Sequence, residues 1–212
     1  MTLRLFWKDP YQTECRAKVL SISGNEVVLD QTVFFAFAGG QASDHGTIGG
    51  IVVIEAKDLK NKITYTLAQL PDFRIGDTIE MRIDWERRAR LMKLHAAVHL
   101  VSFLFAEKTG IAEGIGSNIT PEKGRLDYVY PENLAALLPD LELQANRIMA
   151  ENVPIRRYGD SVDPEKQWWE CGKWKCLCCG THPRSTGEIG KIKLKRANPG
   201  KGKERIEIYL TD

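Results

Sequence analysis

Long apolar segments are absent from this 212-residue chain, in which no run approaches the ~18 consecutive apolar residues that a membrane-spanning helix requires. We therefore expect no span and no membrane partner. The first ten residues include Arg4 and Lys8 but no apolar stretch, so they do not resemble a secretory signal. The formal net charge is only +2, and 43% hydrophobic residues exclude the intrinsically disordered class. These absences predict a globular protein of the cytoplasm.

Cysteine is also scarce, with five residues in the whole chain, and the absence of an export signal argues against a disulfide framework. Four of the five nevertheless fall within nine positions, namely Cys171, Cys176, Cys178 and Cys179. In a reducing compartment such a cluster is typical of metal or redox chemistry. We expect Cys15 and His45, which lie outside any such cluster, to be structural.

Short segments rich in β-branched residues fill the first part of the chain and are separated by turn residues. The expected strands are 19–22, 26–29, 48–54, 63–67 and 78–83. Strands of this length and spacing predict a small sheet or barrel.

At Asp84 the apolar pattern changes to that of a helix. Apolar residues recur at spacings of three and four, namely Leu91, Leu94, Val98, Val101 and Phe105. Asp84 can cap the start of this helix and Gly110 can end it. We place a domain boundary near residues 84–88.

The remainder of the chain mixes both kinds of pattern. A second helix is expected over 141–151, after Pro139, and strands over 187–194 and 205–210. Together with the first half, this predicts an α+β protein.

Two pairs of potential metal ligands have the same spacing of four residues. His95 and His99 share one face of the expected helix, and Cys178 and His182 lie on a glycine-containing loop. Three imidazoles and one thiolate suit a single zinc ion. Alternatively, the histidines belong to ordinary helix surface or core, and Cys171, Cys176 and Cys179 form a separate structural knuckle. Ala96 follows the first histidine where a zinc protease needs glutamate, which excludes that class.

Five motifs, taken in order, resemble those of the alanyl-tRNA editing proteins (the AlaX group), free-standing relatives of the editing domain of alanyl-tRNA synthetase. The motifs are GGQASDHG at 39–46, HAAVH at 95–99, GS at 116–117 with RLDY at 125–128, NRI at 146–148 with ENVP at 151–154, and CCGTH at 178–182 with GEIG at 187–190. The resemblance covers nearly the whole chain and is closest to the medium-length class of the family.

The resemblance implies a fold, an activity and a partner. It implies a small β-barrel-like glycine-rich domain over 1–86, followed by an α+β editing domain over 87–212 with a mostly antiparallel sheet. It also implies a zinc-dependent hydrolase that removes chiefly serine, with glycine as the second candidate, from mischarged alanine tRNA. The zinc ligands carried over from the family motifs are His95, His99, Cys178 and His182. No room remains for a synthetase core, so ATP chemistry is not expected.

Discrimination of serine from alanine requires a polar partner for the serine hydroxyl. Ser117, at the family's GS position, is the first candidate, and Thr181 and Thr120 are further hydroxyl groups; Ser117 is equally well explained as a turn residue. The second histidine of the HxxxH motif often follows threonine in relatives, but here it follows Val98. This departure bears on the preference for serine rather than on the metal.

Two further segments are candidates for contact with tRNA. In the glycine-rich loop these are Gly39, Gly40, Gln41 and Asp44, although its glycines are equally typical of tight turns. Residues 183–205 carry eight basic and two acidic side chains, and Lys191, Lys193 and Arg196 are the expected phosphate contacts. A solvated strand face would have the same composition.

Two alternative functions fit the same motifs. One is editing of a different mischarged tRNA, such as a threonine tRNA, since threonyl-tRNA synthetase carries a related domain. The other is a zinc-stabilised RNA-binding module that retains the fold without turnover.

Overall fold

The computed structural model describes residues 2–59, 62–200 and 202–211. Its internal contacts divide the chain into two units. Unit 1 comprises Met1–Ala38 and Ala42–Ala89, and unit 2 comprises Gly39–Gln41 and Arg90–Asp212. The division follows Ala89, and a three-residue segment of the glycine-rich loop belongs to unit 2.

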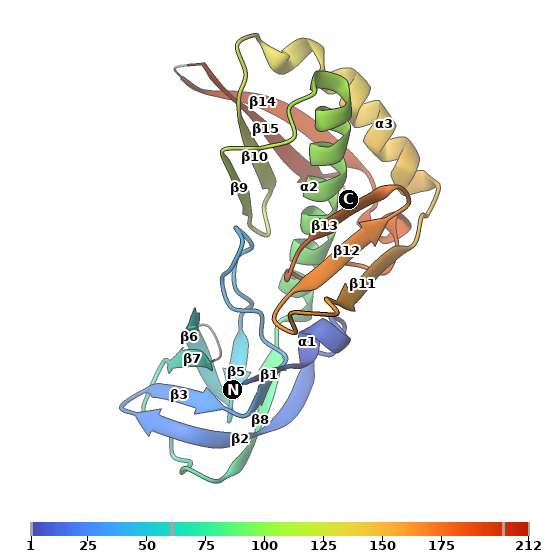
Figure 1. Cartoon of the computed structure of the whole chain (residues 1–212). Helices are drawn as coiled ribbons and strands as arrows, with labels where there is room; N and C mark the ends of the chain where they lie inside the picture. The colour runs from blue at the N-terminus through green and yellow to red at the C-terminus, as the bar shows by residue number, and fades with distance from the viewer. Residues whose placement is uncertain (1, 60–61, 201, 212) are drawn as a thin grey trace. The chain divides into compact units, whose positions relative to one another are not determined.

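Six strands of unit 1 pair in a closed ring (Figure 1). They are β2 (Glu14–Ser23), β3 (Glu26–Leu29), β5 (Gly46–Ile48), β6 (Ile51–Leu59), β7 (Lys62–Leu67) and β8 (Thr78–Ile83). Neighbours are antiparallel in the order β2-β3-β7-β6-β5-β8, and β8 pairs back to β2. Because side chains alternate along a strand, one face of each strand fills the interior; on β7 this face carries the fully buried Ile63, Tyr65 and Leu67.

Three short elements complete unit 1. Strands β1 (Leu3–Arg4) and β4 (Gln31–Thr32) form a separate parallel pair, and α1 (Leu5–Lys8) follows β1 directly. All other strand pairs in the described part of the chain are antiparallel, apart from one isolated bridge.

The long helix α2 (Trp85–Thr109) confirms the helix expected from the sequence, including both ends. Asp84 Oδ1 accepts a hydrogen bond from the backbone N–H of Arg87 at 3.1 Å, as an N-cap should. Gly110 has φ +78° and donates its N–H to the carbonyl of Ala106 at 2.8 Å. All five apolar residues of the predicted face are buried.

Among the described residues, α2 is also the one helix long and apolar enough to cross a membrane by length and composition. The expectation based on consecutive apolar residues did not single it out, because charged residues interrupt its sequence. Of the 18-residue window of α2 with the highest hydropathy, 61% is buried inside the protein. Core helices of soluble proteins meet the same length and composition criterion.

Unit 2 contains a four-stranded antiparallel sheet that packs against α2. Its strands β9 (Gly116–Ile119), β10 (Gly124–Val129), β14 (Ile192–Gly200) and β15 (Lys203–Leu210) are ordered β14-β15-β10-β9. Phe105 of α2 stacks on Tyr128 of β10, with ring centroids 4.1 Å apart. On the same strand, a Cβ at Gly124 would lie 2.6 Å from Val98 Cγ2. Close contact between helix and sheet therefore requires glycine there.

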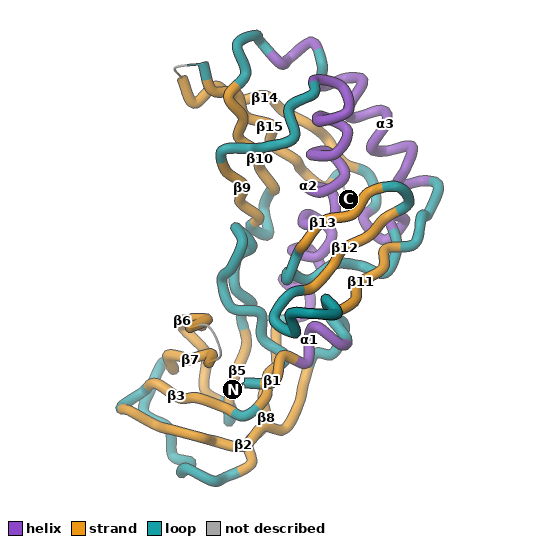
Figure 2. The backbone as a smooth tube through the Cα atoms, viewed as in Figure 1, coloured by secondary structure: helices purple, strands orange, loops and turns teal. Residues whose placement is uncertain are grey.

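The helix α3 (Leu138–Ala150) packs against the same sheet (Figure 2). The Asn146 side chain donates to the carbonyl of Ile192 at 3.0 Å and accepts from its N–H at 2.8 Å. The helix starts three residues earlier than expected because Pro139 lies in its first turn, where its missing N–H costs nothing. A 3₁₀ turn, η1 (Leu134–Ala136), precedes it.

The strand expected over 187–194 is wrong in its first half. Residues Thr186–Ile189 form the 3₁₀ turn η2, and β14 begins only at Ile192. Gly190, at φ +80° and ψ −152°, adopts a conformation open mainly to glycine and separates the two. The expected strand 205–210 lies within β15 and is confirmed.

A second, three-stranded sheet in unit 2 was not expected from the sequence. Its strands are β11 (Ile155–Gly159), β12 (Gln167–Cys171) and β13 (Trp174–Leu177), paired in that order. Its buried Trp169 stacks on Phe103 of α2, with centroids 6.0 Å apart. The sheet thus covers the helix that carries His95 and His99. The α+β class and the mostly antiparallel sheets are confirmed.

Candidate metal centre

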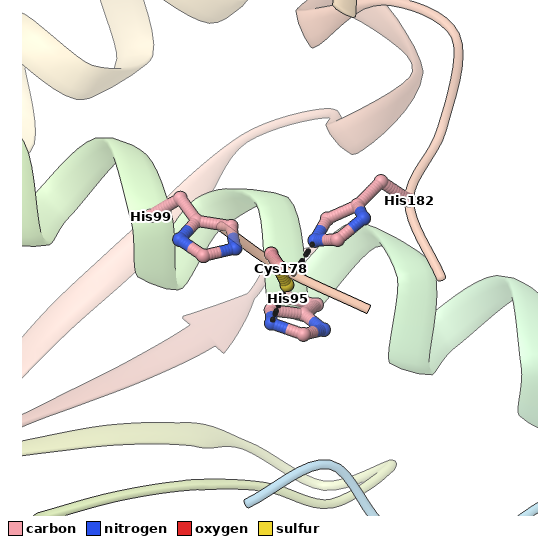
Figure 3. Close-up of side chains that lie close together, drawn as sticks. All are labelled: His95, His99, Cys178 and His182. Atoms are coloured by element: carbon pink, nitrogen blue, oxygen red, sulfur yellow. Dashed lines mark hydrogen bonds between the residues drawn. The ribbon is translucent and has the colours of Figure 1, made fainter. Parts of the chain in front are cut away.

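Helix α2 and the loop after β13 bring four potential ligands together (Figure 3). His95 and His99 project from successive turns of the helix, and Cys178 and His182 come from the loop. One ligand atom from each lies within 4.8 Å of all the others. Cys178 Sγ is 3.4 Å from His95 Nε2 and 3.6 Å from His182 Nε2. Two pairs that are 79 or more residues apart in sequence therefore form one cluster.

Burial sets the protonation of these ligands. It lowers the pKa of His95 and His182 well below the ordinary value and that of His99 to about 4, so all three imidazoles are neutral. It raises the pKa of Cys178 to about 12. A bound cation would favour the thiolate and displace the thiol proton.

The donor set fits zinc. Three neutral imidazoles and one thiolate are ligands that Zn²⁺ accepts together. His99 Nε2 is buried and has no hydrogen-bond partner among the described residues, which leaves a lone pair available to a metal. A soft or borderline cation would satisfy that nitrogen.

Gln41 fixes the orientation of the first ligand. Its Oε1 accepts from the backbone N–H of Thr181 at 3.1 Å, and its Nε2 donates to Thr181 Oγ1 at 2.9 Å. The amide orientation therefore makes Oε1 the acceptor for His95 Nδ1, at 2.7 Å. His95 must carry its proton on Nδ1, and its Nε2 faces Cys178 and is open to a metal.

Two glycines allow these segments to approach one another. A Cβ on Gly180 would lie 2.3 Å from His95 Cε1 and 2.7 Å from Gln41 Oε1. Gly40, at φ +83°, lies equally close to β9, since its Cβ would be 2.6 Å from the carbonyl oxygen of Ser117. Its own carbonyl accepts from the N–H of Ile119 at 2.8 Å. Gly40 is thus required for backbone packing, and Gly39, at φ +57°, for the turn.

The two hydroxyl candidates differ in their surroundings. Ser117 is exposed on β9 beside Gly40. Thr181 is fully buried and its hydroxyl oxygen accepts from Gln41, so it supports Gln41 rather than facing solvent. The third hydroxyl, that of Thr120, bonds to the carbonyl of Lys123 in its own turn.

The expectation that Asp44 contacts tRNA does not fit the structure. Asp44 is 2% exposed, and both carboxylate oxygens accept from the guanidinium of Arg88, with Nε to Oδ1 at 2.9 Å. Oδ2 also accepts from the backbone N–H of Phe35 at 2.6 Å. This carboxylate is a buried structural element of unit 1. His45, expected to be structural, is exposed, and its carbonyl accepts from the N–H of Asp84, which precedes α2, at 2.8 Å.

The basic tail carries less free charge than its composition indicates. Lys193 pairs with Glu142 at 2.9 Å, and Arg196 forms two hydrogen bonds to Glu204. Arg205 is bound to Asp127, with Nε to Oδ1 at 2.6 Å. Lys191 is exposed, and Lys201 lies outside the described residues. Of the three expected phosphate contacts, two are engaged by carboxylates.

Trp169 and Arg157 were missed in the sequence, and Cys176 was considered only for a separate structural knuckle. Trp169 lies against His99, with ring centroids 4.8 Å apart, and Cys176 Sγ is 3.7 Å from His99 Nδ1. The positive charge of Arg157 on β11 contributes to the lowered pKa values of His95 and His182. The sequence signal for β12 and β13 was the alternation of apolar and polar residues in QWWEC and WKC. This alternation is too short to distinguish a strand from a loop.

Several known proteins are similar in sequence to this chain. Residues 170–207 match the family model "Threonyl and Alanyl tRNA synthetase second additional domain". Alanyl-tRNA editing protein AlaX-M of Pyrococcus horikoshii is 36% identical over 99% of this chain and 98% of its own length. The alanine–tRNA ligase of Methanococcus maripaludis strain C7 is 33% identical over 96% of this chain, which corresponds to 25% of the ligase. The chain therefore belongs to the family of alanyl-tRNA editing proteins.

Proposed function

We propose that this protein hydrolyses the ester that joins a wrongly attached amino acid, serine above all and glycine second, to the 3′ end of alanine tRNA. The reaction would take place in the cytoplasm with one zinc ion held by His95, His99, Cys178 and His182. The observation that carries the proposal is the cluster of three imidazoles and one thiol, whose ligand atoms all lie within 4.8 Å of one another. It occurs in a chain that is similar over its whole length to an editing protein.

The bound metal would supply Lewis acidity toward the ester carbonyl or toward a water molecule, which is useful at neutral pH. The residues of this chain prepare the site for that role. Gln41 holds His95 in one tautomer, and Thr181 holds Gln41. We therefore assign Thr181 a positioning role that it exerts through Gln41.

Four protein ligands fill a tetrahedral zinc ion, which is typical of structural sites, so catalysis requires either a fifth coordination position or a loosely held ligand. We propose that His182 is that ligand. Its Nδ1 is buried with no hydrogen-bond partner in the described part of the chain, whereas His95 Nδ1 is held by Gln41. His182 also lies on a loop rather than on the helix.

The proposed tRNA contacts lie in the basic segment 183–205. Lys191 is exposed and remains a candidate phosphate contact, while Lys193 and Arg196 would first have to leave their carboxylate partners. Phosphate contacts of this kind would make tRNA affinity fall as the salt concentration rises.

The proposal is tested by measuring deacylation of alanine tRNA charged with serine, glycine or alanine, and of threonine tRNA charged with serine. We expect fast serine release from alanine tRNA and slow release of alanine. Zinc-depleted protein should be inactive and regain activity when zinc is restored. If folded, zinc-loaded protein releases none of these amino acids, the enzyme proposal fails and the chain is a zinc-stabilised RNA-binding module. Preference for the threonine tRNA would indicate the related editing activity instead.

The substitution Ser117→Ala tests how serine is recognised. If the Ser117 hydroxyl bonds the substrate hydroxyl, its loss should lower kcat/KM for the seryl ester about tenfold, the value of one hydrogen bond. The glycyl ester, which has no hydroxyl, should be hydrolysed at the unaltered rate.

Thr120→Ala is the matched control, because that hydroxyl bonds within its own turn and should leave both rates unchanged. Equal losses on the seryl and glycyl esters would refute a role for Ser117 in selectivity.

A further inference from the structure

The three histidines of the metal centre differ in what holds their second ring nitrogen. His95 Nδ1 bonds to the amide oxygen of Gln41 at 2.7 Å. His99 Nδ1 lies 3.7 Å from Cys176 Sγ, and His182 Nδ1 has no partner among the described residues. A metal-binding histidine usually donates its other ring N–H to an acceptor that fixes the ring. For His99, the nearby acceptor is the sulfur of Cys176.

Strand β13 explains how Cys176 reaches this position. Side chains alternate along a strand, so Cys176 and Cys178 point to one side, while Leu177 between them is 50% exposed on the other. The pairing continues past the end of β13, because the N–H of Cys178 donates to the carbonyl of Gln167 at 2.8 Å. One extended segment therefore presents two sulfur atoms to α2.

The ring of His99 is enclosed by this sheet. Trp169 and Cys176 are direct partners in the β12–β13 register, and Trp169 lies at 4.8 Å from the His99 ring. With Nδ1 directed at Cys176, the remaining nitrogen is Nε2, which is buried without a partner among the described residues. This is the nitrogen that the metal would use, and Nδ1 must then carry the proton.

We propose that Cys176 is a positioning residue for the metal centre, whose sulfur accepts the Nδ1–H of His99 and holds Nε2 toward the ion. The inference rests on the metal site of the proposed function. We do not count Cys176 among the ligands, because the group whose ligand atoms all lie within 4.8 Å of one another is His95, His99, Cys178 and His182. A thiol sulfur at 3.7 Å is a weaker acceptor than a carboxylate or amide. Loss of the Cys176 sulfur should therefore weaken zinc binding by about tenfold, the lower end of the 10- to 100-fold range that is typical of such hydrogen-bond partners.

The test measures zinc affinity by competition with a chromogenic chelator, for the full chain with Cys176→Ala, Cys176→Ser or no substitution. We expect Cys176→Ala to weaken zinc binding about tenfold. Cys176→Ser should restore part of the loss, because its hydroxyl oxygen can accept the same hydrogen bond. Cys179→Ala is the matched control, since that neighbouring thiol donates to the carbonyl of Glu165 at 3.5 Å and its loss should leave zinc affinity unchanged.

Replacing zinc by cobalt(II) adds an absorption spectrum to the test, and a change in packing alone would not alter that spectrum. The thiolate charge-transfer band should keep its intensity in Cys176→Ala, because Cys178 is the single sulfur ligand, while the ligand-field bands shift as His99 loosens. Wild-type affinity in Cys176→Ala, a serine variant no better than alanine, or a weakened thiolate band would each overturn the proposal. If the unsubstituted protein binds no zinc, the proposed function fails instead.

Discussion

Replacing Cys178 by alanine is expected to abolish zinc binding and, with it, deacylation of seryl-alanine tRNA. Cys178 is the sole sulfur in the four-ligand group and lies within 3.6 Å of both His95 Nε2 and His182 Nε2. Its thiolate would be the one anionic ligand, so its loss leaves only neutral donors. Zinc content by atomic emission and serine release by single-turnover assay check the two effects separately.

The same substitution should remove the stabilisation that zinc provides. An ion that binds only the folded state contributes about 4 kcal/mol when its free concentration is 1,000 times the Kd. Thermal melting of the unsubstituted protein should therefore shift upward on adding zinc, and that of Cys178→Ala should not. Cys179→Ala, at the adjacent position, should retain both zinc and the shift. A Cys178→Ala protein with full zinc content and activity would show that the ligand set is wrong.

Replacing Arg88 by methionine is expected to destabilise unit 1 by about 3–5 kcal/mol, the cost of leaving a buried charge without its partner. Both side chains of the Arg88–Asp44 pair are 0% exposed. Arg88 also donates to the carbonyls of Pro10 at 2.8 Å and Val33 at 2.6 Å. Chemical denaturation followed by circular dichroism gives the change in unfolding free energy.

A surface pair provides the control for this prediction. Arg82 contacts Glu14 and Glu80 with more than half of each side chain exposed, so Arg82→Met should cost less than about 1 kcal/mol. Replacing Asp44 and Arg88 together by apolar residues should cost less than replacing Arg88 alone, because no unpaired charge remains. Equal losses for Arg82→Met and Arg88→Met would contradict the role of the buried pair.

Features governed by local periodicity were predicted well. The apolar spacing of α2 and its Asp84 and Gly110 ends depend on neighbours within one helical turn, so the sequence contains the whole signal. The two ligand pairs were visible for the same reason, since each spans four residues. Their convergence was inferred from the donor types, three imidazoles and one thiolate, and the family resemblance supported it, because nothing local relates residue 95 to residue 178.

Features governed by distant partners were missed. From the sequence alone, Asp44 resembles a polar loop residue. In the structure, both of its carboxylate oxygens accept hydrogen bonds from Arg88, 44 positions later. Gln41 was expected to contact tRNA, but its partners are His95 and Thr181, 54 and 140 positions away. The β11–β12–β13 sheet is stabilised by Trp169 packing on α2, and its strands are too short for their alternation alone to identify them.

The three-residue segment Gly39–Gln41 limits how the protein can be divided. Its contacts belong to unit 2, yet the chain on either side of it belongs to unit 1. A fragment that begins at Arg90 would contain all four metal ligands but not Gln41, leaving His95 Nδ1 and the N–H of Thr181 without their acceptor. No single cut between the units yields a complete centre. Gene fusions, split reporters and naturally shortened forms must therefore retain the segment Gly39–Gln41 or supply another hydrogen-bond acceptor for His95 Nδ1.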